Sequence, residues 1–209
     1  MRYKRFPLGG LWTNGYLFWD EGGEAFFVDP GGDATEVLEF IRGHGLNLRA
    51  VLLTHGHLDH IVGVRDLQPL VGGEVYISGG DADMLRRPSE AMQTALRMRC
   101  EGLADFHEVA EGMTLAVGAF RIEVMETPGH TPGGVCYLIR DGEERVLISG
   151  DTLFAQSVGR TDLPGGEPSR LDDSLRKLSK LPDSLLVLPG HGPETTIGKE
   201  RQHNPFWPV

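Results

Sequence analysis

The chain has 209 residues, enough for one domain with a sizeable hydrophobic core. Its formal net charge of −10 argues against nucleic acid or an anionic membrane surface as a partner, because both attract clustered positive charge. The sequence contains no apolar stretch of about 18 residues, no signal-peptide pattern and only two cysteines. We therefore expect a single cytoplasmic domain over 1–209, while the oligomeric state stays open.

Short runs rich in Val, Ile, Leu and Phe, bounded by Gly, Pro or Asp, are predicted to be strands. In chain order they cover residues 16–19, 25–29, 50–54, 74–78, 120–126, 135–139, 146–149 and 185–188. Helical periodicity predicts helices over residues 35–42, 61–70, 89–99 and 170–181. Strands and helices alternate along the whole chain, which predicts a layered α/β domain.

Residues 54–60 read Thr-His-Gly-His-Leu-Asp-His and join an apolar strand to a predicted helix. Neutral imidazole and carboxylate are ligands that suit zinc, iron or manganese. A spacing of two places His55 and His57 on a common side of an extended chain, whereas Asp59 and His60 point elsewhere as the helix begins. One loop can thus serve two neighbouring metal ions. The alternative is a polar loop whose histidines cap the helix.

Three further polar residues, His130, Asp151 and His191, each follow a predicted strand, where α/β folds build their sites. The two histidines lie in similar Pro-Gly-His turns, at 128–130 and 189–191. Glycine permits a tight turn and proline stiffens it, so each turn can hold its histidine in a fixed position. Any one of these residues alone is more typical of a turn, but together with the loop they make seven candidate ligands.

The order His-x-His-x-Asp-His, followed by a distant His, Asp and His, resembles the signature of the metallo-β-lactamase fold superfamily. Within it, four segments resemble the short glyoxalase II-like, or hydroxyacylglutathione hydrolase-like, hydrolases. They are Thr-Pro-Gly-His-Thr-Pro-Gly at 127–133, Ser-Gly-Asp-Thr-Leu-Phe at 149–154, Gly-Arg-Thr-Asp at 159–162 and the tail 189–206. The resemblance implies an αββα sandwich with the site at one edge of the two sheets.

The resemblance also implies two divalent metal ions, zinc in the first instance, with iron or manganese as alternatives. The first ion would be held by His55, His57 and His130, the second by Asp59, His60 and His191, and Asp151 would bridge them. Two ions about 3.5–4 Å apart lower the pKa of a shared water toward about 7, so hydroxide can attack a carbonyl at neutral pH. Asp59 is expected to be catalytic, orienting the nucleophile and accepting its proton.

The expected substrate is a small thioester such as an S-2-hydroxyacylglutathione, because a thiolate is a good leaving group. Arg160 is a candidate for binding a substrate carboxylate through its forked guanidinium, and the alternative is a structural pair with Asp162. Full-length glyoxalase II enzymes continue into a helical domain that holds glutathione, and we expect that domain to be absent here. The identity of the thiol therefore stays open.

Two other branches of the superfamily remain as alternatives. Iron-dependent persulfide dioxygenases share the segment at 159–162, and their one iron would be held here by His55, His130 and Asp151. Their last histidine, however, lies in Pro-Ala-His-Asp, whereas residues 189–192 read Pro-Gly-His-Gly, which favours the hydrolase. Lactonases share all seven ligands. A methionine-containing segment at 80–104 is either a substrate-facing flap or ordinary packing.

Overall fold

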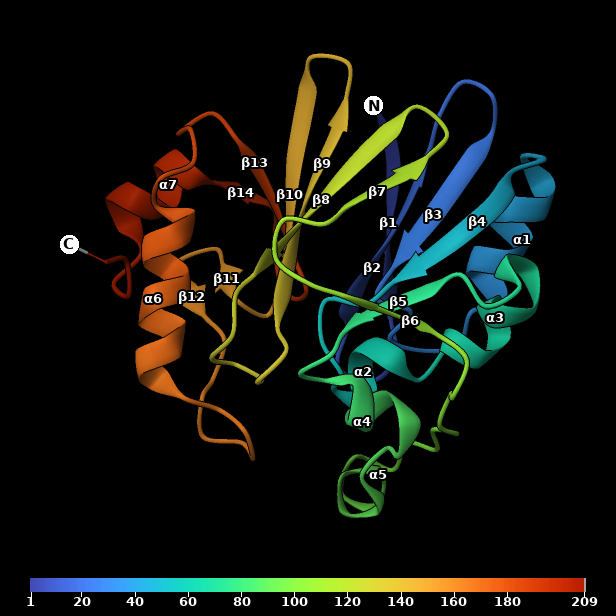
Figure 1. The fold of residues 1–209 in the computed structure, drawn as a ribbon, viewed down its shortest axis with the longest axis horizontal. Helices are drawn as coiled ribbons and strands as arrows, with labels where there is room; N and C mark the ends of the chain where they lie inside the picture. Colours follow the sequence, from blue (N-terminus) through green and yellow to red (C-terminus); the bar gives the residue numbers. More distant parts are fainter. Residues whose placement is uncertain (209) are drawn as a thin grey trace.

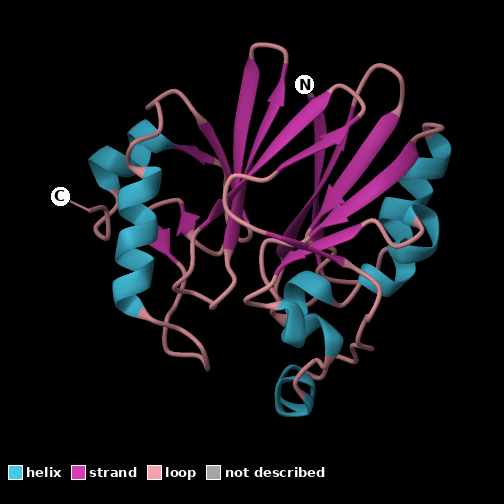
Figure 2. Cartoon of the chain, in the orientation of Figure 1, coloured by secondary structure: helices cyan, strands magenta, loops and turns pink. Residues whose placement is uncertain are grey.

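The computed structural model describes residues 1–208, which form two sheets packed face to face with helices on both outer faces (Figure 1, Figure 2). The first sheet contains, in spatial order, β1 (Arg2–Leu8), β2 (Thr13–Trp19), β3 (Glu24–Val28), β4 (Asn47–Leu52), β5 (Val75–Ser78) and β6 (His107–Val109). Its first three strands are antiparallel, whereas β3 to β6 run parallel.

The second sheet contains β14 (Thr195–Thr196), β13 (Leu186–Pro189), β10 (Glu144–Gly150), β9 (Val135–Asp141), β8 (Phe120–Glu126) and β7 (Thr114–Val117). Neighbouring strands are antiparallel except β10 and β13, which are parallel. A separate two-stranded ribbon joins β11 (Leu153–Phe154) to β12 (Ser157–Val158). The strands β8, β10 and β13 therefore run in the same direction and end at the same edge.

The helices cover the outer faces of the two sheets and one end of the sandwich (Figure 1). The first sheet is covered by α1 (Thr35–Gly43), α2 (Leu58–Ile61) and α3 (Val64–Val71). After β5 come α4 (Ala82–Arg86) and α5 (Glu90–Leu96), and the second sheet is covered by α6 (Pro168–Leu178) and α7 (Ile197–His203). No helix among residues 1–208 is long and apolar enough to cross a membrane.

The core between the sheets is built on aromatic rings from alternate positions of the strands. Phe18 stacks on Phe26 with 5.0 Å between ring centroids, and Phe120 of the opposite sheet meets Phe26 edge-on at 5.2 Å. Leu17 points the other way, into the core beneath the helices of the first sheet. Both faces of β2 are therefore buried, which explains why residues 16–19 are continuously apolar rather than alternating.

The predicted αββα architecture is confirmed, and every predicted strand lies on a strand of the structure. The sequence reasoning missed β1, β6, β7, the two-residue strands, α4 and α7. The helix predicted over 61–70 is wrong in its bounds, because Gly63 separates α2 from α3 and donates its N–H to the carbonyl of Pro30 at 2.8 Å. The helix predicted over 89–99 ends early, since Arg97 adopts a left-handed φ of 53°.

Replacement of Phe26 by alanine should lower the free energy of unfolding by about 3–5 kcal/mol, because the ring is fully buried between the sheets. Urea denaturation at matched metal content measures this change. The control is Phe206→Ala, since the Phe206 side chain is 56% exposed and its loss should change stability by no more than about 0.5 kcal/mol. Equal effects of the two substitutions would contradict the assignment of the core.

Candidate metal centre

The structure brings together all seven side chains that the sequence singled out, at one edge of the sandwich. Each lies just beyond the carboxyl end of a strand. His55 and His57 follow β4, and Asp59 and His60 occupy the first turn of α2. The other three follow β8, β10 and β13, and they are His130, Asp151 and His191. Because the strands of each sheet that carry them end at the same edge, residues far apart in sequence meet there.

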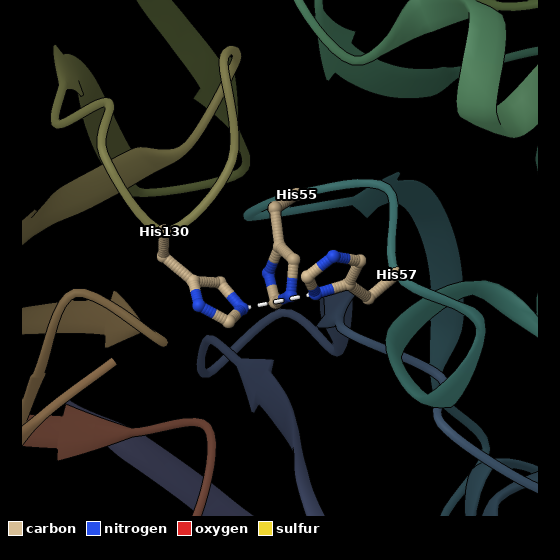
Figure 3. A group of neighbouring side chains, drawn as sticks. All are labelled: His55, His57 and His130. Atoms are coloured by element: carbon tan, nitrogen blue, oxygen red, sulfur yellow. Dashed lines mark hydrogen bonds between the residues drawn. The ribbon is translucent and has the colours of Figure 1, made fainter. Parts of the chain in front are cut away.

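One group consists of three imidazole rings, from His55, His57 and His130, that point toward one another (Figure 3). One nitrogen from each ring lies within 4.8 Å of the other two. The Nδ1 atom of His57 is 2.9 Å from the Nε2 atom of His130. Three converging imidazole nitrogens are the donor set of many zinc sites.

A second group contains Asp59, His60 and His191, whose ligand atoms also lie within 4.8 Å of one another. The Nε2 atom of His191 is 3.3 Å from Oδ2 of Asp59. Asp151 lies between the groups: its Oδ1 is 3.4 Å from Nε2 of His60, and its Oδ2 is 3.5 Å from Nε2 of His130. One carboxylate therefore contacts members of both groups.

Three buried polar atoms of the site test whether a metal fits it. The Nε2 atoms of His55 and His60 and the Oδ1 atom of Asp151 are buried without a hydrogen-bond partner among the described residues. Buried polar groups almost always have a partner, and a divalent cation would supply one to all three. The residues therefore fit a metal. Gly190 leaves room for this arrangement, since a Cβ there would collide with Asp151 and His60.

Behind the ligands, Asp29 joins the two groups through a chain of hydrogen bonds. The backbone N–H and the hydroxyl of Thr54 donate to Asp29 at 2.8 and 2.6 Å, and Nδ1 of His60 donates to it at 2.9 Å. The hydroxyl of Thr54 donates its only proton to Asp29. Its oxygen therefore accepts a hydrogen bond from Nδ1 of His55 at 3.1 Å. With Nδ1 engaged in these outer hydrogen bonds, the rings of His55 and His60 both direct Nε2 into the site. Hydrogen bonds of this kind commonly orient the histidine ligands of metal sites.

A second carboxylate, Asp81, joins the two segments that carry the three-histidine group. Its Oδ2 accepts from the N–H of Gly56 at 2.9 Å, and its Oδ1 accepts from the N–H of Gly133 at 2.6 Å. Its side chain is completely buried, so water does not compete for these bonds. Nδ1 of His130 donates to the carbonyl of Arg160 at 2.7 Å, which leaves Nε2 free to face the site.

Burial and neighbouring charge shift the pKa values of the site residues in opposite directions. Burial, with the neighbouring His60, lowers the pKa of His55 well below its usual value, and burial with His130 lowers that of His57 to about 4. Burial also opposes protonation of His60, but Asp151, Asp29 and Asp59 outweigh it and raise its pKa. Burial opposes ionisation of Asp59, yet His60 and His191 keep its pKa below the usual range. The lowered pKa values keep Asp59 and Asp151 anionic and His55 and His57 neutral, which suits a cation. The pKa values of His60 and His191 are raised, so each would release a proton when it binds a metal ion.

Asp29 and Asp81 were missed by sequence reasoning, although Asp29 is the last residue of one predicted strand and Asp81 follows another. A search for carboxylates at every strand end would have found them. The guanidinium of Arg160 pairs with Asp162 through two contacts of 2.6 Å and is exposed, which is the alternative left open by the sequence. The segment 80–104 contributes Met84 and Met92 to a pocket beside the site.

Comparisons with known proteins assign this fold and site to a family. The metallo-β-lactamase superfamily profile matches residues 8–191, and the chain belongs to this superfamily. The chain is 36% identical to hydroxyacylglutathione hydrolase GloC of Haemophilus influenzae over 209 residues, which are 99% of this chain and 98% of that protein. The chain is therefore an enzyme, a metallo-hydrolase. This follows from the superfamily match together with similar proteins that are named as hydrolases.

Two solved structures are similar over nearly their whole length. The crystal structure of BLEG-1 B3 metallo-β-lactamase is 39% identical with a TM-score of 0.91, covering 99% of both chains. TTHA1623, solved in a di-iron-bound form, is 36% identical with a TM-score of 0.85, covering 97% of this chain and 99% of that one. The two sheets and their helices thus follow the metallo-β-lactamase fold.

Substitution of Asp29 by asparagine should weaken metal binding about 10–100-fold, since the amide has one acceptor oxygen and cannot accept all three hydrogen bonds from the Thr54 N–H, the Thr54 hydroxyl and His60. Competition against a chelator of known affinity measures the change. Asp172→Asn, on the exposed face of α6, removes the same charge far from these hydrogen bonds and should leave affinity unaltered. Wild-type affinity in the Asp29 variant would show that this network does not hold the ligands.

Removal of metal by a chelator should lower the melting temperature by roughly 5–10 °C, because binding stabilises only the folded site. The melting temperature falls because metal removal leaves buried polar atoms of His55, His60 and Asp151 without a partner. Differential scanning calorimetry, with metal content verified before and after, makes the comparison. Identical melting curves for the loaded and metal-free protein would argue against a metal at this position.

Proposed function

We propose that the chain is a binuclear metallo-hydrolase that cleaves a small thioester, such as an S-2-hydroxyacylglutathione. The observation that carries the proposal is the position of Asp151, which contacts His60 and His191 of one group and His130 of the other. Two sets of three ligands sharing one carboxylate are suited to a pair of ions. The similarity to hydroxyacylglutathione hydrolase GloC supports a thioester as the substrate.

In this proposal His55, His57 and His130 would hold the first ion, Asp59, His60 and His191 would hold the second, and Asp151 would contribute to both sites. Zinc is the proposed metal, because histidine nitrogens and carboxylate oxygens suit it. Iron is the first alternative, supported by the di-iron form of TTHA1623, and manganese the second. When bound, such ions supply Lewis acidity that activates water at neutral pH and stabilises negative charge on a carbonyl oxygen.

Asp59 is the proposed catalytic residue of the chain itself. Its Oδ2 accepts a hydrogen bond from the hydroxyl of Thr13 at 3.2 Å and lies 3.3 Å from His191. These two contacts fix the direction of the carboxylate, so it can orient an attacking water and accept its proton. Water adds its oxygen to the thioester carbonyl carbon, the carbon–sulfur bond breaks, and a carboxylate and a thiol are released.

The proposed setting of this activity follows from the same observations. Residues 1–209 would act as one catalytic domain on a small molecule, since the superfamily profile covers 8–191. The cytoplasm is the proposed compartment, because both Cys100 and Cys136 are buried free thiols. Arg160 stays a predicted substrate contact, and any such role requires its guanidinium to leave Asp162.

Thiol release from S-D-lactoylglutathione, measured without oxygen on protein loaded with zinc or with iron, tests the proposal. We expect chelator-sensitive release, and we expect Asp59→Ala to lower kcat by a factor of about 100 or more, because it removes the proton acceptor. Asp172→Asn serves as the matched control and should keep wild-type activity. Full activity in the Asp59 variant would exclude that residue from the mechanism, and no release in either metal form would exclude this thioester.

A second candidate function is β-lactam hydrolysis, supported by the 39% identity to the BLEG-1 B3 metallo-β-lactamase. Both reactions need an activated water and an electrophilic carbonyl, so the same seven side chains serve either. Parallel assays separate these activities. They measure hydrolysis of a chromogenic cephalosporin, hydrolysis of a lactone and, for the iron form, oxygen uptake with glutathione persulfide. The substrate with the highest kcat/KM identifies the reaction.

A further inference from the structure

An apolar pocket of about 300 Å³ opens directly beside the three-histidine group. One wall is the metal-binding loop itself, another is formed by α4 and the start of α5, and a third by the loop before α6. The side chains that define these walls are His57, Leu58, Met84, Met92, Leu163 and Pro164. Because His57 belongs both to the pocket and to the candidate metal centre, a molecule reacting at the centre can extend into the pocket.

The pocket wall is fixed to the metal-binding loop by close packing. A Cβ added to Gly56 would lie 2.6 Å from the Cβ of Met84, so glycine is required for α4 to approach the loop so closely. Asp81, at the start of α4, accepts the N–H of the same Gly56. Met84 and Met92 are only half-buried, and flexible thioether side chains adapt well to an apolar ligand.

The charges around the pocket lie at its rim. Asp83 accepts a hydrogen bond from Arg86 at 3.2 Å, so its carboxylate is already paired. Arg87 lines the pocket, and no carboxylate lies within 4.0 Å of its guanidinium in the described part of the chain, residues 1–208. The interior is thus hydrocarbon and thioether, with one available cation at the edge. A charged, peptide-like thiol such as glutathione does not match such an interior.

We propose that this pocket binds the acyl chain of the substrate, so that the enzyme prefers medium-length apolar acyl groups, such as hexanoyl, to acetyl or lactoyl. The inference rests on the proposed thioester hydrolysis and names the substrate class of that site. A cavity of 300 Å³ is at the lower end of those that hold whole small molecules, so a lactoyl group leaves most of it unfilled. Met84, Met92 and Leu163 are then the residues that determine acyl-chain specificity.

The test measures binding separately from turnover. The probes are ketone analogues in which a methylene replaces the thioester sulfur, and they carry an acetyl, butyryl or hexanoyl arm. Calorimetric titration into zinc-loaded and metal-free protein measures the Kd of each analogue. Each methylene buried should lower Kd about fourfold, which corresponds to about 0.8 kcal/mol. We expect at least a tenfold gain from butyryl to hexanoyl, and a parallel rise in kcat/KM for the thioesters themselves.

Two substitutions from different walls locate the effect. Met84→Trp fills the pocket and Leu163→Asp places a charge in it, so each should abolish the gain between butyryl and hexanoyl. Met113→Trp is the matched control, because Met113 is an exposed methionine outside the pocket, and it should retain the gain. Melting curves confirm that each variant is folded, and two variants keep the test decisive if one fails to fold.

The outcomes separate this inference from the function on which it rests. Equal Kd values for all three arms in the wild-type protein would overturn the pocket assignment, even if thioesters are hydrolysed. A full chain-length gain retained in both Met84→Trp and Leu163→Asp would overturn it as well. Chain-length-dependent binding that both variants lose, without hydrolysis of any thioester, would support the pocket as an acyl-chain site and reject the proposed reaction.

Discussion

Desolvation of seven polar side chains at one end of a hydrophobic sandwich is the constraint on which the rest of the structure depends. Five imidazoles and two carboxylates lie so close together that burial and neighbouring charge both shift their pKa values, acting together at His55 and in opposition at Asp59 and His60. The Nε2 atoms of His55 and His60 and the Oδ1 atom of Asp151 are left without hydrogen-bond partners among the described residues. Such an arrangement is costly in a protein interior unless a cation completes it.

The sandwich makes this arrangement possible by ending its strands together. Parallel β3, β4 and β5 deliver Asp29, the histidine loop and Asp81 to one edge, and β8, β10 and β13 deliver the remaining ligands from the opposite sheet. The two buried carboxylates then act as cross-links. Asp29 joins the two ligand groups through Thr54 and His60, and Asp81 joins the two segments that carry the three-histidine group.

The centre and the adjacent pocket carry different kinds of information. The ligand set supports activation of water and stabilisation of a carbonyl oxygen, chemistry that many members of one fold can share. Apart from His57, the pocket is built from residues outside the ligand set, chiefly methionines of α4 and α5 and the loop before α6. If the pocket binds the acyl chain as proposed, reaction type and substrate choice are separable in this molecule, because different side chains determine them.

The sequence by itself indicated a layered α/β domain and seven candidate ligands, and its resemblance to the superfamily implied the αββα arrangement and the two groups of ligands. These features can be predicted because strands appear as local apolar patterns in the sequence and because only a few residue types bind metal ions. Only the tertiary structure decided the break at Gly63, the roles of Asp29 and Asp81, and the pocket between Met84 and Leu163. Each of these depends on contacts between residues distant in the chain, such as Asp81 with Gly133. The local spacing of residues does not predict such contacts, since only tertiary packing brings the partners together.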